Sequence, residues 1–237
     1  MKILHMISGG RDSLLSASIQ AEKSDKLILI TFDNGCIHDL ACVQPQVDEL
    51  KKIHKDKCII YIKDILTAMT FNKYLQSFNY NGTAVTDGLG YDLLKPYMMN
   101  CMCCRVAMYT HSIALANALN VDILSDGTRK DGGFITDEAE LLEEIKKLAK
   151  IYNIDLEFPV YDMESNFERK VLLSERGLPT KVKEPQCYLG MPPTSKLTKQ
   201  EVYQYTKWFK NYIYKNMVED INRLKDLYKH RYSEVLT

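Results

Sequence analysis

The 237-residue sequence predicts an α/β fold, with a doubly wound, mainly parallel sheet, helices on both faces and a helical C-terminal extension. Two observations predict this class. Short apolar runs alternate with segments of helical periodicity, as expected for βαβ units. The hydrophobic content of 46% is enough for one large core. We therefore expect one domain over residues 1–195 and a helical extension, rich in aromatic and basic residues, over residues 196–237.

The first third of the chain sets the alternation. An apolar run at residues 2–7 stops at two glycines and predicts a short buried strand. Apolar residues at helical spacing follow it and predict a helix over residues 12–22. The same pattern then continues, and it predicts strands at 27–32 and 58–62 and helices at 41–54 and 63–76.

Segment 79–100 interrupts the alternation. It is rich in Gly, Asn and Thr, so we expect a long loop beside a site. Regular structure is predicted again after it, as helices at 102–118, 137–152 and 165–176 and strands at 121–125 and 155–158. A turn-rich stretch at 177–193 leads to the extension, which is expected to be helical from Thr198. Its aromatic and basic side chains could bind RNA, but amphipathic packing on the core or on a second subunit is the favoured interpretation.

Charge and cysteine content limit the partners, the cellular compartment and the cysteine chemistry that we expect for the protein. Thirty-one basic and thirty-one acidic side chains cancel, so any RNA contact has to come from a local patch. The N-terminal residues lack the pattern of a secretory leader, and no stretch of 18 apolar residues is free of charge, so we expect a cytoplasmic protein without a membrane partner. In that compartment, seven cysteines are expected to be free thiols, metal ligands or redox groups.

The first motif is a strand that ends in Ser-Gly-Gly and opens directly into a helix. Such a turn points backbone N–H groups and the positive end of the helix dipole at one place, which makes an anion site. Ser8 and Ser13 add hydroxyl groups, and Asp12 is placed to hold magnesium on phosphates. No Gly-Lys-Ser/Thr follows, and the spacing is not that of a dinucleotide fingerprint.

Ser8, Gly9, Gly10, Arg11, Asp12 and Ser13 together resemble the S-G-G-x-D-S signature of the PP-loop ATP pyrophosphatases. The resemblance covers roughly residues 1–190 and implies that the loop grips the pyrophosphate released from ATP. It also implies that Asp33, at the end of the second strand, lies near adenosine. In segment 126–131, it implies that Gly127 and the catalytic Asp131 lie near ATP and magnesium, with Arg129 and Lys130 neutralising phosphate charge.

Three cysteines crowd into four residues, and a further one stands apart in a turn. Cys101 and Cys104 are three positions apart on a predicted helix, so both sulfurs face the same side, whereas Cys103 points away. We expect the helix N-terminus and Arg105 to lower the pKa values of these thiols. Cys187 is isolated in Glu-Pro-Gln-Cys-Tyr.

This cysteine pattern on a PP-loop domain resembles the tRNA thiolation enzymes, some of which bind a [4Fe–4S] cluster through three cysteines. The resemblance implies that Cys101, Cys104 and Cys187 are cluster ligands and that Cys103 is a substitute ligand or a catalytic sulfur carrier. A four-cysteine zinc site, as in the related deazaguanine nitrile synthases, is an alternative, although the cysteine distribution fits it poorly. A disulfide relay or persulfide chemistry without a cluster also stays open.

Together, the two motifs predict an ATP-dependent sulfurtransferase. A carbonyl oxygen of a nucleobase attacks the α-phosphate and releases pyrophosphate, and sulfur from sulfide or a persulfide then displaces AMP. The acceptor is a base in tRNA or in a free metabolite. Alternatives are an ATP-dependent ligase that forms an amide or nitrile on a deazapurine, and a non-catalytic nucleotide-binding protein with structural zinc. The oligomeric state stays open, with a homodimer as one alternative.

Overall fold

The computed structural model describes residues 1–86, 93–189 and 195–232. Its centre is a five-stranded parallel sheet in the order β4-β2-β1-β5-β6. The strands are β1 (Lys2–Met6), β2 (Lys26–Phe32), β4 (Cys58–Asp64), β5 (Ile123–Asp126) and β6 (Asp155–Glu157). A second, antiparallel pair joins β3 (Ile37–His38) to β7 (Gln186–Cys187). The predicted α/β class is confirmed.

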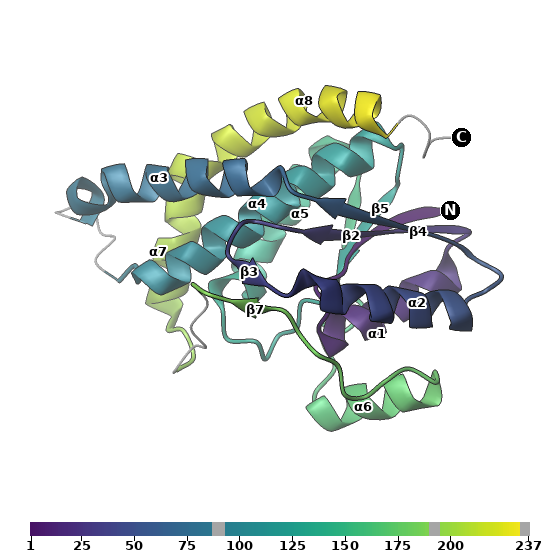
Figure 1. Cartoon of the computed structure of the whole chain (residues 1–237). Helices are drawn as coiled ribbons and strands as arrows, with labels where there is room; N and C mark the ends of the chain where they lie inside the picture. Colours follow the sequence, from purple (N-terminus) through teal and green to yellow (C-terminus); the bar gives the residue numbers. More distant parts are fainter. Residues whose placement is uncertain (87–92, 190–194, 233–237) are drawn as a thin grey trace.

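Helices cover both faces of the parallel sheet (Figure 1). One face packs on α1 (Arg11–Lys23), α2 (Gln44–Ile53) and α6 (Asn166–Glu175) through one apolar cluster. The other face packs through a larger cluster on α3 (Thr67–Thr86), α4 (Pro96–Ala118) and α5 (Ala139–Ile151). Helix α4 is buried nearly all round, because the sheet lies on one side and the C-terminal helices on the other.

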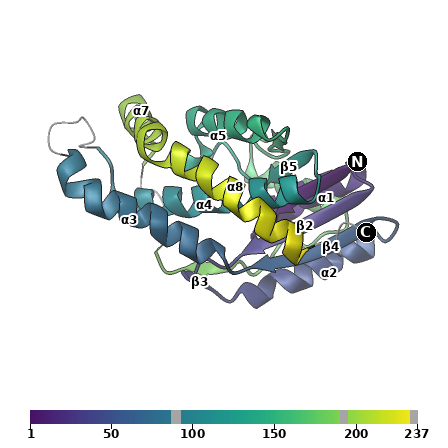
Figure 2. The ribbon, with the colours of Figure 1, turned by 90° about the horizontal axis from the view of Figure 1, so that it is seen from above.

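The C-terminal residues form α7 (Lys199–Trp208), a π-helical turn (Phe209–Ile213) and α8 (Tyr214–Arg231). Helix α8 crosses α4 (Figure 2). Tyr205, Trp208, Phe209 and Tyr228 are fully buried in the same cluster as α4. These aromatic side chains are therefore core residues rather than a surface for stacking bases.

The predicted loop over residues 79–100 is wrong at both ends. Helix α3 continues to Thr86, and α4 begins at Pro96, while residues 87–92 lie outside the described part of the chain. Proline at the first helical position, here Pro96, is a signal for the start of a helix. At the other end, Phe78 packs edge-on against Trp208 at 6.1 Å, a contact with a distant helix that stabilises the longer α3.

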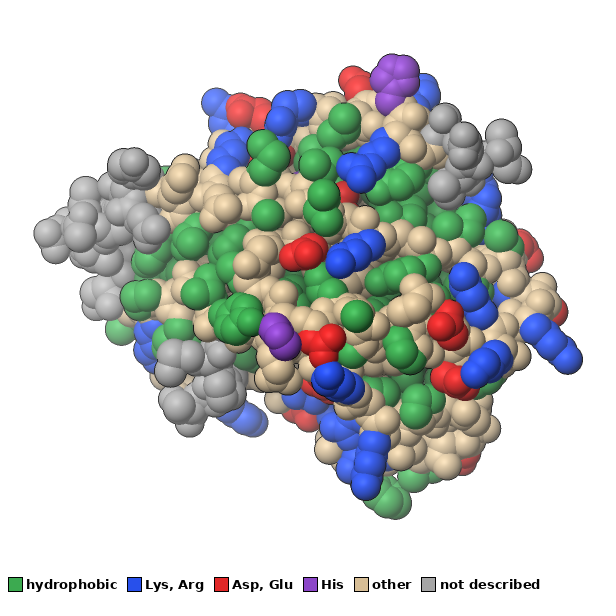
Figure 3. Space-filling view, in the orientation of Figure 1, with side chains coloured by type: hydrophobic (Ala, Val, Ile, Leu, Met, Phe, Trp, Pro, Cys, Tyr) green, Lys and Arg blue, Asp and Glu red, His purple; other side chains and the backbone are tan. Residues whose placement is uncertain are grey.

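No helix in the three described ranges combines the length and apolar character needed to cross a lipid bilayer. The face shown in Figure 3 carries basic and acidic side chains interspersed with one another, in keeping with the net charge of zero.

A buried polar network ties α8 to the sheet. Tyr228 donates a hydrogen bond to the Asp64 carboxylate at 2.7 Å and contacts the ring nitrogen Nδ1 of His111. Burial lowers the pKa of His111 to about 4, so its ring is neutral. All three side chains are fully buried, so the network lies between α8, α4 and the end of β4.

We expect Tyr228→Phe to lower the free energy of unfolding by about 1–3 kcal/mol, because the Asp64 carboxylate loses a buried donor. Urea unfolding of the variant measures the loss. Tyr203→Phe is the matched control, since Tyr203 is 59% exposed on α7. Equal stability of the two variants would contradict the structural role of this network.

Candidate active site

The first loop, residues 7–10, joins β1 to α1 and is fixed by its own serines. Ser13 Oγ donates a hydrogen bond to the Gly10 carbonyl at 2.8 Å and accepts one from the Ser8 backbone N–H at 3.2 Å. Gly9 has a φ of 88°, a value that favours glycine. No side chain caps the N-terminus of α1, so the N–H groups of its first turn can bind an anion.

The buried ring of His5, in β1, connects the start of α1 to β5 by hydrogen bonds. Its Nε2 lies 2.9 Å from the Ser13 carbonyl, and its Nδ1 lies 3.1 Å from the Ser125 hydroxyl. Burial lowers the pKa of His5 to about 4, so the ring is neutral. Because a carbonyl only accepts, Nε2 carries the proton and donates to Ser13, and Nδ1 accepts from Ser125. No motif around His5 in the sequence indicates this role.

Two other segments pack directly on the first loop. A Cβ on Gly127 would lie 2.5 Å from Ser13 Cα, and a Cβ on Gly9 would lie 2.8 Å from Pro185 Cδ. Real side chains do not tolerate such distances, so glycine is required at both positions. The segment after β5 and the segment before β7 therefore form part of the wall around the loop.

Asp12 sits in a network of two carboxylates and two guanidinium groups. Arg129 Nη1 and Arg169 Nε lie 3.0 and 2.9 Å from its two oxygens. The same arginines reach Asp131 at 3.3 and 3.2 Å. Arg169 comes from α6 and is only 2% exposed, and nothing near it in sequence distinguishes it. A magnesium ion would have to compete with both arginines for Asp12.

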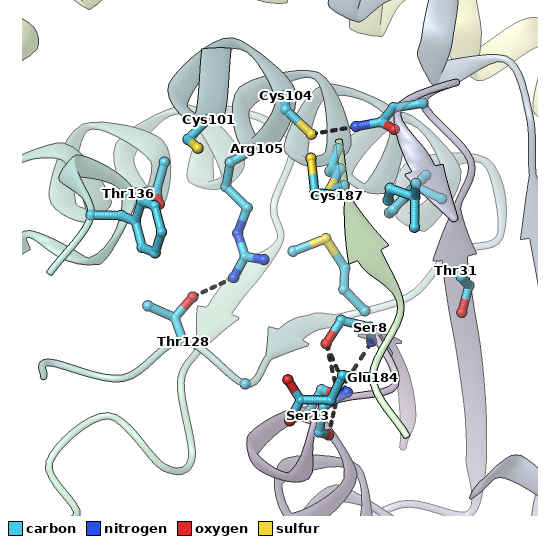
Figure 4. Close-up of a pocket in the computed structure, with 18 of the residues that line it drawn as sticks. Ser8, Ser13, Thr31, Cys101, Cys104, Arg105, Thr128, Thr136, Glu184 and Cys187 are labelled. Carbon is cyan, nitrogen blue, oxygen red and sulfur yellow. Dashed lines mark hydrogen bonds between the residues drawn. The ribbon is translucent and has the colours of Figure 1, made fainter. Parts of the chain in front are cut away.

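A cavity of about 530 Å³ joins the first loop to the cysteines (Figure 4). The residues of its lining that carry chemistry are Ser8, Gly10, Arg11, Asp12 and Ser13; Asn34 and Cys36; Cys101, Cys104 and Arg105; Gly127, Thr128 and Arg129; Asp137; Glu184 and Cys187. The structure thus brings most of the predicted ATP residues and all three predicted cluster ligands to one space.

Some predicted residues lie elsewhere. Gly9, Asp33, Lys130 and Asp131 are absent from the described lining of the cavity. Asp33 accepts from the Gly35 N–H at 3.1 Å and lies 4.0 Å from Lys63. Lys130 is exposed to solvent.

The cysteines reach the cavity from two elements. Cys101 and Cys104 project from one side of α4, and Cys187 faces them from β7 (Figure 4). Asn34, which no sequence motif marks as a site residue, donates to Cys104 Sγ at 2.7 Å. Cys103 is 1% exposed in the apolar core and does not line the cavity. Helical register therefore separates it from its two neighbours.

The expected lowering of the thiol pKa values is wrong. Burial raises the pKa of Cys101 to about 11 and that of Cys104 to about 12. Helix α4 begins at Pro96, so the cysteines lie beyond the first turn, where the helix dipole acts. The charge of Arg105 does lower the pKa of Cys104, but the effect of burial is larger. The guanidinium of Arg105 is also paired with Asp126 at 3.0 Å.

The donor chemistry of Cys101, Cys104 and Cys187 fits an iron–sulfur cluster. Cysteine thiolates are the usual ligands of such clusters, and three of them face one cavity. In a cluster each thiolate would bind a different iron, so the three ligands need not converge on one point. A single zinc needs its ligands within about 2.3 Å of one point, and the described residues contain no group of three arranged in that way.

Arg105 lies between the first loop and the cysteines (Figure 4). Its Nη2 donates to Asp126 at 3.0 Å and to Thr128 at 2.5 Å. Tyr109 donates to the same Asp126 carboxylate at 2.5 Å, which holds that acid in place. The charge of Asp126 raises the pKa of Arg105, so the guanidinium stays protonated.

Comparisons with known proteins give structural neighbours only. No protein-family model and no curated protein matches the sequence. A U34-tRNA thiolase, NcsA from Methanococcus maripaludis with its [4Fe–4S] cluster, is 18% identical with a TM-score of 0.47, over 95% of this chain and 73% of its own. A predicted subunit of tRNA methyltransferase from Methanocaldococcus jannaschii is 19% identical with a TM-score of 0.42, over 83% and 94%. Neither likeness assigns a family or an activity to this chain.

Proposed function

We propose that this chain is a PP-loop ATP pyrophosphatase that acts as an ATP-dependent sulfurtransferase on a nucleobase. The observation that carries the proposal is the single cavity shared by the first loop and by Cys101, Cys104 and Cys187. An anion site alone would suit many nucleotide-binding proteins. The described lining also holds four cysteines, these three and Cys36, which add a second chemistry, and thiolation uses both.

The first loop and its neighbours would bind ATP. The free N–H groups at the start of α1 are suited to the β- and γ-phosphates, and Arg11 and Arg129 line the same part of the cavity as cations. The acceptor's carbonyl oxygen would attack the α-phosphorus, so that a new P–O bond forms and pyrophosphate leaves. The protein contributes positioning and charge neutralisation in this step.

Cys101, Cys104 and Cys187 would hold a [4Fe–4S] cluster, with sulfide or a persulfide as the sulfur source. When bound through three cysteines, such a cluster supplies an iron that is open to sulfur. Asn34 fixes the Cys104 sulfur by a hydrogen bond, and the pairing of β7 with β3 positions Cys187. These contacts orient two of the three ligands before any cluster is bound.

The acceptor is proposed to be a base in tRNA or in a free metabolite. To test the proposal, anaerobically reconstituted protein is incubated with ATP, sulfide, unmodified tRNA and a nucleoside mixture, and both pools are analysed by mass spectrometry. We expect AMP, pyrophosphate and a base in which sulfur replaces oxygen. An amide or nitrile product would instead identify a ligase, and absence of AMP would indicate a non-catalytic nucleotide-binding protein.

A further inference from the structure

The turn after β2 brings a further cysteine to the cavity. Cys36 belongs to the described lining, together with the three proposed cluster ligands, and its side chain is half-buried. The family resemblance implied that Asp33 of this turn lies near adenosine, yet Asp33 is absent from the lining, whereas Asn34 and Cys36 are part of it. The turn therefore contributes an amide and a thiol to the site rather than a carboxylate.

Backbone hydrogen bonds fix the position of Cys36. Asn34 Oδ1 accepts from the Cys36 N–H at 2.9 Å, and Gly35 between them has a φ of 79°, a value that favours glycine. The Cys36 carbonyl accepts from the Tyr188 N–H at 2.9 Å. Both polar groups of the Cys36 backbone are thus engaged, so the turn holds the residue while its side chain can rotate about the Cα–Cβ bond.

The contacts of Cys36 lead directly to two of the proposed ligands. Asn34 binds the Cys36 N–H through Oδ1 and the Cys104 Sγ through Nδ2, at 2.7 Å, so a single amide group spans the two cysteines. Ile37, the residue after Cys36, pairs with Cys187 in the ladder between β3 and β7. Cys36 is therefore a neighbour of one ligand on α4 and of one on β7.

Four thiols around one cavity are one more than a cluster with an open iron needs. A [4Fe–4S] cluster takes up to four cysteine thiolates, one on each iron. Three ligands leave one iron open, and a fourth thiolate at the same cavity closes it. Of the four cysteines, Cys36 is the one suited to leave again, because it lies in a turn, whereas Cys101 and Cys104 are in α4 and Cys187 is in β7.

On the basis of the proposed function, we propose that Cys36 is the fourth ligand of the cluster and that sulfide displaces it. At rest, the Cys36 thiolate closes the iron that the other three cysteines leave open. Hydrosulfide then forms the new iron–sulfur bond with its own electron pair, while the bond to Cys36 breaks. The Cys36 thiolate leaves with its electron pair and takes a proton from water, so the exchange is not a redox step. Cys36 thereby covers the reactive iron until the sulfur source arrives.

Loss of iron on oxidation tests the fourth ligand without any turnover. Anaerobically reconstituted protein is treated with ferricyanide, its iron is counted, and the [3Fe–4S] product is quantified by electron paramagnetic resonance. An iron without a thiolate is held less tightly than one with a thiolate, so it is lost first. We expect the wild type to keep its iron and Cys36→Ala to give about tenfold more of the [3Fe–4S] signal.

Sulfide binding gives a second measurement on the same samples. Because no ligand has to be displaced in Cys36→Ala, sulfide should bind to it about tenfold more tightly than to the wild type, as followed by the visible absorption of the cluster. Cys36→Ser is expected to behave in the same way, since a serine hydroxyl is a poor ligand for iron. Cys42→Ala is the matched control, because Cys42 is also half-buried but lies outside the described lining.

The outcomes separate this inference from the proposed function. Equal iron loss and equal sulfide affinity in the wild type and Cys36→Ala would overturn the inference alone and would leave a cluster with three cysteine ligands. If Cys42→Ala lost iron as readily as Cys36→Ala, the effect would not belong to the cavity thiol, and the inference would also be overturned. A wild-type protein that takes up no iron would contradict the proposed cluster, and the fourth ligand with it.

Discussion

Replacing Cys187 by serine is expected to lower acceptor thiolation about 100-fold or more, while ATP affinity stays within about twofold of the wild type. A serine hydroxyl is a poor ligand for iron, so the cavity loses one of the three thiols that would hold the cluster. The loss of ATP affinity is small because Cys187 faces Cys104 rather than the first turn of α1 (Figure 4). Iron content, thiolated product and calorimetric ATP binding are measured on anaerobically purified protein.

Cys58→Ser and Cys103→Ala are the controls for this variant. Cys58 is exposed at the start of β4, and Cys103 is buried in the core away from the cavity. Both variants should keep iron and thiolation, with Cys103→Ala losing only some stability. A Cys187→Ser protein with normal iron and normal thiolation would contradict the ligand assignment, and inactive Cys103→Ala protein at wild-type stability would restore Cys103 as a sulfur carrier.

Replacing Gly127 by alanine is expected to weaken ATP binding about 100-fold, the second large effect. The added Cβ would lie 2.5 Å from Ser13 Cα and 2.7 Å from the Asp12 carbonyl carbon. Both are backbone atoms, so the first turn of α1 has to move, and the N–H groups that bind phosphate move with it. Isothermal titration calorimetry with ATP measures the loss, and thermal unfolding reports on the fold.

Lys130→Ala is the matched control in the same segment. Lys130 is exposed and lies outside the described cavity lining, so its removal should leave ATP affinity unchanged. If Gly127→Ala bound ATP as tightly as Lys130→Ala did, the close packing of the segment after β5 on the first loop would have no functional consequence.

Local patterns made part of this architecture predictable. The alternation of apolar runs and helices was enough for the parallel sheet, and the Gly9-Gly10 turn could be located because a strand, a turn and a helix follow one another directly. That Cys103 points away from Cys101 and Cys104 followed from helical spacing alone. These features depend on neighbouring residues, which the sequence displays.

Contacts between distant segments were not predictable. Arg169 reaches Asp12 from α6, and Asn34 reaches Cys104 from the end of β2, without a motif at either position. Cys187 is placed by a pairing of two-residue strands, which is too short to carry a periodicity. The thiol pKa values depended on burial, which overruled the helix and the neighbouring arginine.

The central claim is that one acceptor oxygen is activated by ATP and then replaced by sulfur in this cavity. Its most direct test uses an acceptor base whose carbonyl carries ¹⁸O, incubated with wild-type protein, ATP and sulfide in unlabelled water. The account predicts that each thiolated base formed is matched by one AMP that carries the ¹⁸O, because the oxygen leaves on the α-phosphate. Unlabelled AMP, or ¹⁸O retained in the product, would contradict it.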